Sequence, residues 1–248
     1  MQQGLLPMIS STTVRRWLSE LAIKPWHYRS WISVRDPEFE TKAGRILDLY
    51  AGVWDGEPLG PDDMVICADE KTSIQARGRS EPVRPPGSGH VSHMEYDYQR
   101  GGAVTYLAAL DVFQGTVLGR VVGKTGIMPF RDLVRQVMRR KRYRHARRVF
   151  WIVDNGSSHQ PGTFGTWLTQ HYPNAMAVHL PVHASWLNQI ESYFSIVQRK
   201  ALTPNDLPTI AAVALRILDF EQDYNRTAQP FKWRFTRDDL RRRLKGAA

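Results

Sequence analysis

Apolar residues along the chain alternate between the spacing of strands and the spacing of helices. Runs rich in β-branched and aromatic residues predict strands at residues 64–75, 103–123, 147–156 and 175–183, with a hairpin turn at residues 113–115 inside the second run. Apolar residues three and four positions apart predict helices at residues 36–54, 126–141, 162–172, 185–202 and 206–225. The helix at residues 206–225 is expected to be the last of the chain. This order predicts a mixed α/β fold, in which sites lie at the carboxyl ends of strands.

The amino-terminal part of the chain is predicted to be a short helical region. Residues 10–31 begin with Ser and Thr residues that can cap a helix, and apolar residues follow at helical spacing. A short basic helix of this kind fits either the reading helix of a helix-turn-helix unit or a helix packed on a neighbour. The Gly-, Pro- and Asp-rich stretch 55–63 predicts a linker. We therefore expect a helical region at residues 1–58 and a second domain at residues 59–248.

The chain carries an excess of positive charge, with 34 Lys and Arg residues against 24 Asp and Glu residues, a net charge of +10 and a pI near 9.9. This balance favours a polyanionic partner, with nucleic acid ahead of an anionic membrane surface. Seven of the ten residues at 139–148 are Lys or Arg, although a solvated helix end explains such a run equally well. Contacts with phosphates would depend on salt and not on DNA sequence. The candidate DNA-binding residues are Arg15, Arg16, Arg139, Arg140, Lys141, Arg142 and Arg144.

The composition disfavours several other classes of protein. Cys67 is the only cysteine, which rules out an internal disulfide and a cluster of cysteine ligands for zinc, and fits a reducing compartment. No apolar stretch approaches the roughly 18–20 residues of a membrane span. The first residues also make a poor signal peptide, because no cationic segment precedes a short apolar one. We expect a soluble protein of the cell interior.

Two acidic residues directly follow predicted buried strands. Asp154 comes after an apolar run, where burying a carboxylate is costly unless a cation or several hydrogen bonds compensate. The alternatives for Asp154 are a helix cap or a turn formed with the next two residues. Asp69 leaves its strand in the same way. Glu70 beside it is expected to point to the other face and to be structural.

A third acid, Glu191, lies at the border of the apolar face of the predicted helix 185–202, although a solvated face is the simpler explanation of a single such residue. Three carboxylates from two strands and a helix can hold two divalent cations, which prefer hard oxygen ligands. In such a site one cation activates a water or a 3′ hydroxyl, and the other stabilises the leaving oxygen of a phosphoryl displacement. Asp69, Asp154 and Glu191 are therefore candidate metal ligands.

Four segments together resemble the catalytic core of the mariner-like superfamily of transposases, in particular its bacterial insertion-sequence branch. They are ICADEKTSIQ (66–75), EYDYQRGGAVTYLAALDVFQGTVLG (95–119), VFWIVDNGSSH (149–159) and VHLPVHASWLNQIESYFSIVQRK (178–200). The resemblance runs from about residue 60 to the carboxyl terminus, and HASWLNQIE after a strand is its most specific part. The 36 residues between Asp154 and Glu191 suit the Asp-Asp-Glu pattern of that branch.

The resemblance implies a ribonuclease H-like fold, with a mixed sheet flanked by helices. It implies that Asp69, Asp154 and Glu191 are catalytic and bind Mg²⁺, with Mn²⁺ as a substitute. The implied activity is that of a two-metal polynucleotidyl transferase, which cleaves DNA at transposon ends and joins the 3′ hydroxyl to target DNA, commonly at a TA step. A homodimer on double-stranded DNA is expected, acting in the bacterial cytoplasm on the nucleoid.

Three further residues are expected to support the acids. Asn155 and His159 follow the second acid as an Asn and a His do in members of that superfamily, so they are candidates to orient a phosphate or a metal-bound water. A turn role for Asn155 is an equal alternative. Asn188 comes shortly before Glu191 and is expected to shape the site or touch DNA. Residues 10–31 then correspond to the end of a helix-turn-helix region.

Two other functions stay open on the sequence alone. One is a ribonuclease H-like nuclease that cuts nucleic acid without strand transfer. The other is a DNA-binding remnant that keeps the fold and the charge but no longer turns over. Analysis of the DNA products distinguishes the nuclease from a transposase, because the nuclease leaves nicks and never joined strands. Salt-sensitive DNA binding without metal-dependent cleavage identifies the binding remnant.

Overall fold

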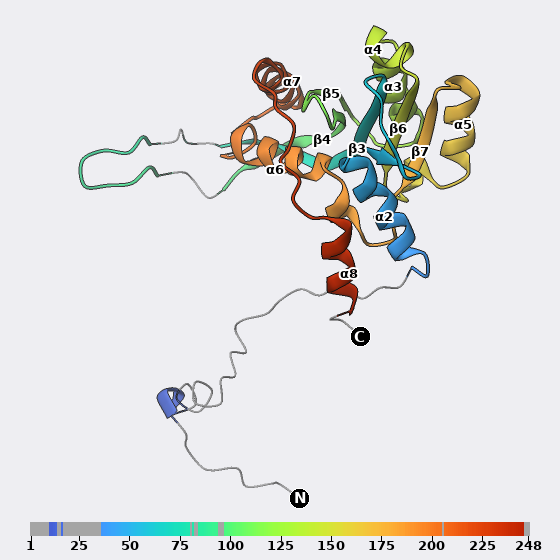
Figure 1. The fold of residues 1–248 in the computed structure, drawn as a ribbon. Coiled ribbons are helices and arrows are strands. Elements are labelled where there is room, and N and C mark those ends of the chain that lie inside the picture. Colours follow the sequence, from blue (N-terminus) through green and yellow to red (C-terminus); the bar gives the residue numbers. More distant parts are fainter. Residues whose placement is uncertain are drawn as a thin grey trace, which may run out of the picture.

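A five-stranded mixed sheet forms the centre of the computed structural model (Figure 1), which describes residues 10–13, 16, 36–79, 81, 84–93, 97–204 and 206–245. Its strands are β3 (Asp63–Gly78), β4 (Gln99–Asp111), β5 (Val117–Val122), β6 (Arg148–Val153) and β7 (Ala175–His179). Their order across the sheet is β5-β4-β3-β6-β7, with β3, β4 and β5 antiparallel and with β6 and β7 parallel to β3. Two short strands, β1 (Val53–Trp54) and β2 (Glu57–Pro58), pair separately.

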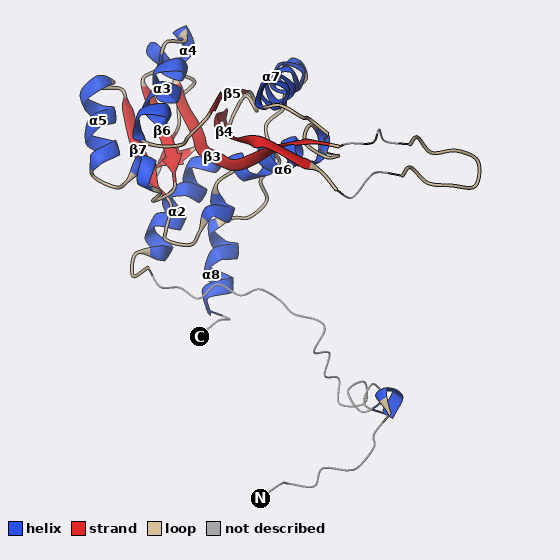
Figure 2. Cartoon of the chain, turned by 180° about the vertical axis from the view of Figure 1, so that it is seen from behind, coloured by secondary structure: helices blue, strands red, loops and turns tan. Residues whose placement is uncertain are grey.

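Helices cover both faces of this sheet (Figure 2). One core cluster joins it to α2 (Phe39–Tyr50), α6 (Ile190–Lys200), α7 (Ile210–Arg226) and α8 (Arg237–Lys245). The opposite cluster joins it to α3 (Ile127–Met138), α4 (Lys141–Arg144) and α5 (Thr163–His171). Short 3-10 turns, η1 (Ser157–His159) and η2 (Ser185–Leu187), precede α5 and α6. The mixed α/β architecture predicted from the sequence is confirmed.

The central strands are apolar on both faces because helices cover both of them. In β6, Phe150 faces the cluster that contains α2 and α6, whereas Trp151 faces the cluster that contains α3 and α5. Both residues are fully buried. The same alternation in β3 places Val65 in the first cluster and Ile66 in the second. Beyond Arg148, β6 therefore carries only apolar side chains. The expectation that Asp69 leaves its strand was wrong, because β3 continues through Asp69 and further polar residues to Gly78, held there by its pairing with β4.

The prediction that residues 206–225 form the final helix was wrong, since α8 follows at Arg237–Lys245. Leu240 buries itself in the core, and the arginines of α8 form ion pairs with α2, including Arg241 with Glu40 at 3.6 Å and Arg237 with Asp48. The segment reads RDDLRRRLK, so its charge hides the helical pattern of its two leucines. Tertiary contacts, more than an apolar stripe, define this helix.

The predicted boundary lies between residues 58 and 59, so helix α2 falls before it and the central sheet after it. Helix α2 nevertheless packs in the same hydrophobic core as that sheet. Within the predicted region 10–31, Ser11–Thr13 and Arg16 are helical, and the other residues after position 13 lie outside the described part of the chain. In the described ranges, no helix combines the length and the apolar character needed to cross a membrane.

Part of the basic run is used to hold the β4–β5 turn. Asp111, which is 1% exposed, accepts hydrogen bonds from the amides of Phe113 and Gln114 at 3.1 and 3.0 Å. It also accepts one from the Tyr143 hydroxyl at 3.1 Å and one from Arg142 Nε at 3.2 Å. Arg142 is thus bound to a buried carboxylate of the fold.

We expect Asp111→Ala to lower the free energy of unfolding by about 2–4 kcal/mol, because it leaves several buried donors without an acceptor. Arg142→Ala is the matched control. It should cost less than about 1 kcal/mol, because that side chain is half exposed and Asp111 keeps its other donors. Urea unfolding followed by circular dichroism measures both values. Equal losses would show that the ion pair, and not the hydrogen-bonded turn, holds this corner.

Candidate active site

The pairing of β3 with β6 sets two acids side by side. The strands are parallel, and Cys67 lies opposite Ile152. Extending this register by two residues sets Asp69 beside Asp154, on neighbouring chains that run roughly 4.8 Å apart. Each carboxylate also accepts a hydrogen bond from a backbone amide nitrogen 2.7 Å away. Asp69 accepts from the amide of Glu70, and Asp154 accepts from the amide of Gly156. The turn considered for Asp154 is therefore present, and Asp154 still lies at the carboxyl end of β6 beside β3.

The third acid, Glu191, arrives from the first turn of α6. The segment before α6 is fastened to the rest of the fold by two hydrogen bonds. Asn188 Nδ2 donates to the carbonyl of Ala68 at 3.2 Å, and the Tyr50 hydroxyl donates to the carbonyl of Leu187 at 2.7 Å. Asn188 thereby ties the start of α6 to β3 at the residue before Asp69, which fixes where Glu191 can lie.

The pKa values of Asp69 and Glu191 both respond to burial and to the charge of Asp154. Burial raises the pKa of Asp69 to about 7, and the charges of Asp154 and Glu70 add to this rise. Glu191 is exposed as a residue, but partial burial of its carboxyl group raises its pKa, and Asp154 again adds to the rise while Lys71 opposes it. Asp154 thus acts on both of the other predicted acids.

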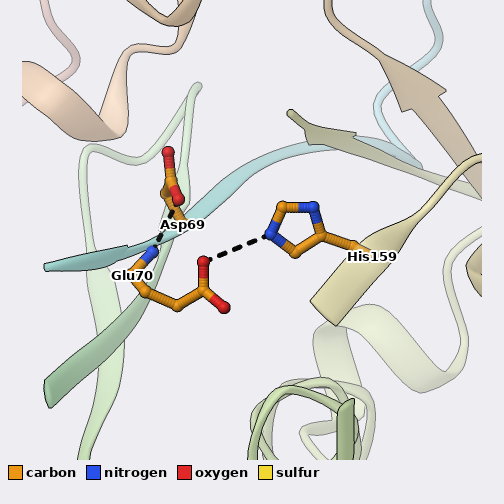
Figure 3. A group of neighbouring side chains, drawn as sticks. All are labelled: Asp69, Glu70 and His159. Carbon is orange, nitrogen blue, oxygen red and sulfur yellow. Dashed lines mark hydrogen bonds and ion pairs between the residues drawn. The ribbon is translucent and has the colours of Figure 1, made fainter. Parts of the chain in front are cut away.

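Glu70 and His159 complete the group (Figure 3). Asp69 and Glu70 leave β3 in different directions, yet ligand atoms of Asp69, Glu70 and His159 all lie within 4.8 Å of one another. The fully buried His159 ring places Nε2 3.3 Å from a Glu70 oxygen, and Nδ1 3.0 Å from the carbonyl and 3.1 Å from a carboxylate oxygen of Asp154. Glu70, expected to be structural, thus contacts the histidine that also contacts Asp154.

Charge stabilises the contact between Glu70 and His159. Burial by itself lowers the pKa of His159, but Glu70 and Asp154 outweigh it and raise that pKa. Burial would raise the pKa of Glu70, but hydrogen bonds from His159, Ser158 and Thr125 outweigh burial and lower it to about 2. The protonated ring can donate to Glu70 and to Asp154 at the same time. His159 therefore links β3 to the segment that carries Asp154.

Other predicted residues have different surroundings. Asn155 donates through Nδ2 to the carbonyl of Leu180 at 2.8 Å, which ties the segment after β6 to the end of β7. The basic residues from Arg139 to Arg144 precede the amino end of β6, whereas Asp154 follows its carboxyl end. The six residues of β6 span about 20 Å, so this run lies away from the acids. Arg16 is exposed, and Arg15 lies outside the described residues.

Comparison with known proteins identifies the family of the chain. A sequence model of the DDE superfamily endonucleases matches residues 64–213, a range that includes all three acids. The chain belongs to this family. No curated protein sequence matches it.

The fold also resembles solved structures of the Mos1 mariner transposase. The Mos1 paired-end complex with Mn has a TM-score of 0.58 and 15% identity, over 96% of this chain and 70% of that chain. The Mos1 strand transfer complex has a TM-score of 0.58 and 14% identity, over 96% and 69%. At this identity the likeness concerns the fold, and it confirms the predicted ribonuclease H-like sheet flanked by helices.

The donor set of this DDE chain fits a divalent cation. Asp69, Asp154 and Glu191 offer hard carboxylate oxygens, and the raised pKa values of Asp69 and Glu191 reflect burial together with mutual repulsion. A bound cation would relieve that repulsion. Glu70 and His159 are engaged with each other, which suits them to hold the Asp154 segment in place.

We expect Asp69→Asn to stabilise the metal-free protein at neutral pH. The folded protein keeps a proton on Asp69 up to about pH 7, whereas the unfolded chain releases it near the ordinary value of 3.8. Stability due to this group therefore falls as pH rises from about 4 to 7. Above pH 7 the variant should melt about 2–6 °C higher than wild type, and the gap should close toward pH 4.

Thermal melts at several pH values in a chelator measure this difference. Asp219→Asn, which removes the same charge from an exposed position of α7, is the matched control and should show no such pH trend. Adding Mn²⁺ at pH 7.5 should raise the melting temperature of wild type more than that of Asp69→Asn. A variant that is less stable than wild type at every pH would contradict the repulsion described above.

Proposed function

We propose that this chain is the catalytic part of a DNA transposase. It would cleave a phosphodiester at a transposon end and join the exposed 3′ hydroxyl to target DNA. The observation that carries the proposal is the effect of one acid on the two others: the charge of Asp154, which follows β6, raises the pKa of Asp69 in β3 and that of Glu191 in α6. Membership of the DDE superfamily endonucleases supports a phosphodiester substrate.

In this proposal Asp69, Asp154 and Glu191 hold two divalent cations, Mg²⁺ or in its place Mn²⁺. The cations supply activation of a water or a 3′ hydroxyl and stabilisation of the leaving oxygen. The protein supplies position: β3 and β6 align Asp69 with Asp154, and Asn188 fixes the start of α6 beside β3. His159 holds the Asp154 segment through its contacts with Asp154 and Glu70.

Double-stranded DNA is the proposed partner, and the net charge of +10 supports a polyanion. A homodimer is proposed as well. The related Mos1 structures are paired-end complexes, and a pair of equivalent ends is most simply bound by two copies of one chain. The residues before 36 would take part in recognising the ends, and the site of action would be bacterial DNA in the cytoplasm.

The test compares wild type with Asp154→Asn on a labelled duplex that carries the element's own ends, with Mg²⁺ or Mn²⁺. Wild type should nick the duplex and join it to a target plasmid only when metal is present. The variant should bind the duplex equally well and lose at least about 100-fold in the rate of both reactions, because one ligand of the cations is gone. Electrophoresis under denaturing conditions separates nicked from joined strands.

Three outcomes would contradict this proposal. Metal-dependent nicks that never lead to joined strands, even with pre-nicked ends, would indicate a ribonuclease H-like nuclease. DNA binding by wild type without any cleavage would indicate a binding remnant. Cleavage that survives in both Asp154→Asn and Asp69→Asn would place the reaction away from the three acids.

A further inference from the structure

A cavity of about 310 Å³ lies directly beside Glu191. The carboxyl-terminal half of α6 lines it with Phe194, Ser195, Gln198 and Arg199, and β3 lines it with Lys71. A second cavity of about 330 Å³ shares Gln198 with the first and extends along β3. Its lining residues are Ser73, Ile74, Gln75, Arg77, Arg79, Gln198, Leu202, Thr203 and Pro204. We call the two cavities together the Lys71 groove.

The strand geometry explains why this groove begins at the acids. Lys71 follows Asp69 by two positions and therefore shares its face of β3. Helix α6 packs against that face, and Lys71 lies close enough to Glu191 to oppose the rise in its pKa. Arg199 follows Glu191 by eight residues, or about 12 Å along the helix. The groove thus leads from the third acid along β3 and α6.

The lining has the chemistry that binds phosphates. It offers the cationic groups of Lys71, Arg77 and Arg199, together with amide and hydroxyl donors. Among the residues that the structure describes, Glu191 is the only acid that lines either cavity. Within the described ranges, neither Lys71 nor Arg199 forms an ion pair. The Nε atom of Arg77 is buried without a hydrogen-bond partner among those residues. Backbone phosphates accept hydrogen bonds from groups of these kinds.

A larger cavity of about 500 Å³ between β5 and α3 is less suited to this role. It also contains arginines, but Asp132 lies within it and pairs with Arg135 at 2.7 Å and with Arg120 at 3.8 Å. None of the candidate metal ligands lines that cavity. Its positive charge is therefore partly neutralised and lies apart from the acids.

We propose that the Lys71 groove binds the sugar–phosphate backbone of the strand being cleaved, on one side of the reacting phosphodiester. Lys71 and Arg199 contact its phosphates, and the 12 Å between Glu191 and Arg199 corresponds to roughly three nucleotides at 3.4 Å each. This inference rests on the proposed function, because it takes Glu191 as a ligand of the cation at which that phosphodiester reacts.

The first test measures the salt dependence of DNA binding for Lys71→Gln and Arg199→Gln. Each variant should reduce the slope of log affinity against log salt by about 0.7–0.9, because it neutralises one phosphate fewer than wild type. Lys232→Gln and Arg216→Gln remove the same charges from exposed positions outside the groove and are the matched controls. Lys71→Arg keeps the charge and should keep the slope. Variants that match the controls would overturn the proposal.

The second test locates the phosphates that the groove binds, by placing single methylphosphonates, which lack the phosphate charge, along the cleaved strand of the element's end. A substitution within roughly three nucleotides of the cut should weaken binding by wild type about 5–10-fold. The same substitution should weaken DNA binding little further in the variant that already lacks the side chain contacting that phosphate. Equal effects in wild type and in both variants would contradict the groove.

These tests separate the groove from the proposed function. Mn²⁺-induced stabilisation should be unchanged in Arg199→Gln, so a loss of DNA affinity there does not reflect a damaged cation site. If wild type cleaves DNA but the groove variants bind DNA like the controls, the proposed function is supported and the proposed role of the Lys71 groove is contradicted. If the groove variants reduce the salt dependence of DNA binding but wild type never cleaves DNA, phosphate binding in the Lys71 groove is supported and the proposed function is contradicted.

Discussion

The parallel register of β3 and β6 is the constraint on which the site depends. Buried side chains on both faces, such as Val65 on one and Trp151 on the other, fix this register, because a slip of one residue would turn every side chain to the opposite face. The same register forces the carboxylates of Asp69 and Asp154 together. Hydrophobic burial thus offsets an electrostatic repulsion that the two acids could not overcome alone.

Long-range hydrogen bonds then bring the remaining parts of the site to this edge. Tyr50 of α2 reaches Leu187 before α6, and Asn188 reaches Ala68 in β3. His159 connects Glu70 with the Asp154 segment. Helix α2 therefore belongs to the framework of the site although the predicted linker separates it in sequence. The acids occupy places that a rigid frame determines before any cation binds.

The sequence is informative where local chemistry decides the structure. Continuous apolar runs identify the strand residues before Asp69 and Asp154, so the place of Asp154 at the end of β6 could be predicted. Asp69 lies inside β3, because pairing with β4 continues that strand through polar residues that the apolar pattern does not mark. The pairing of Glu70 with His159 joins positions 89 residues apart, and strand alternation alone suggests that Glu70 leaves the site. In the sequence Arg142 is one of several cationic residues in a basic run, but in the structure it forms an ion pair with buried Asp111. Such partners depend on tertiary packing, which the local pattern does not encode.

A cluster of acids that acts on DNA must also overcome its repulsion of the phosphate backbone. The basic run around Arg139 to Arg144 cannot compensate at the acids, because β6 puts about 20 Å between them and the screening length at physiological salt is about 8 Å. Bound cations neutralise the acids themselves but leave the flanking phosphates without partners. Fixed positive charges are needed within a few nucleotides of the reacting bond, and Lys71 and Arg199 are the cations that line the cavity beside Glu191. In the proposed function, the local placement of these charges, more than the total of +10, would decide which DNA strand the acids can reach.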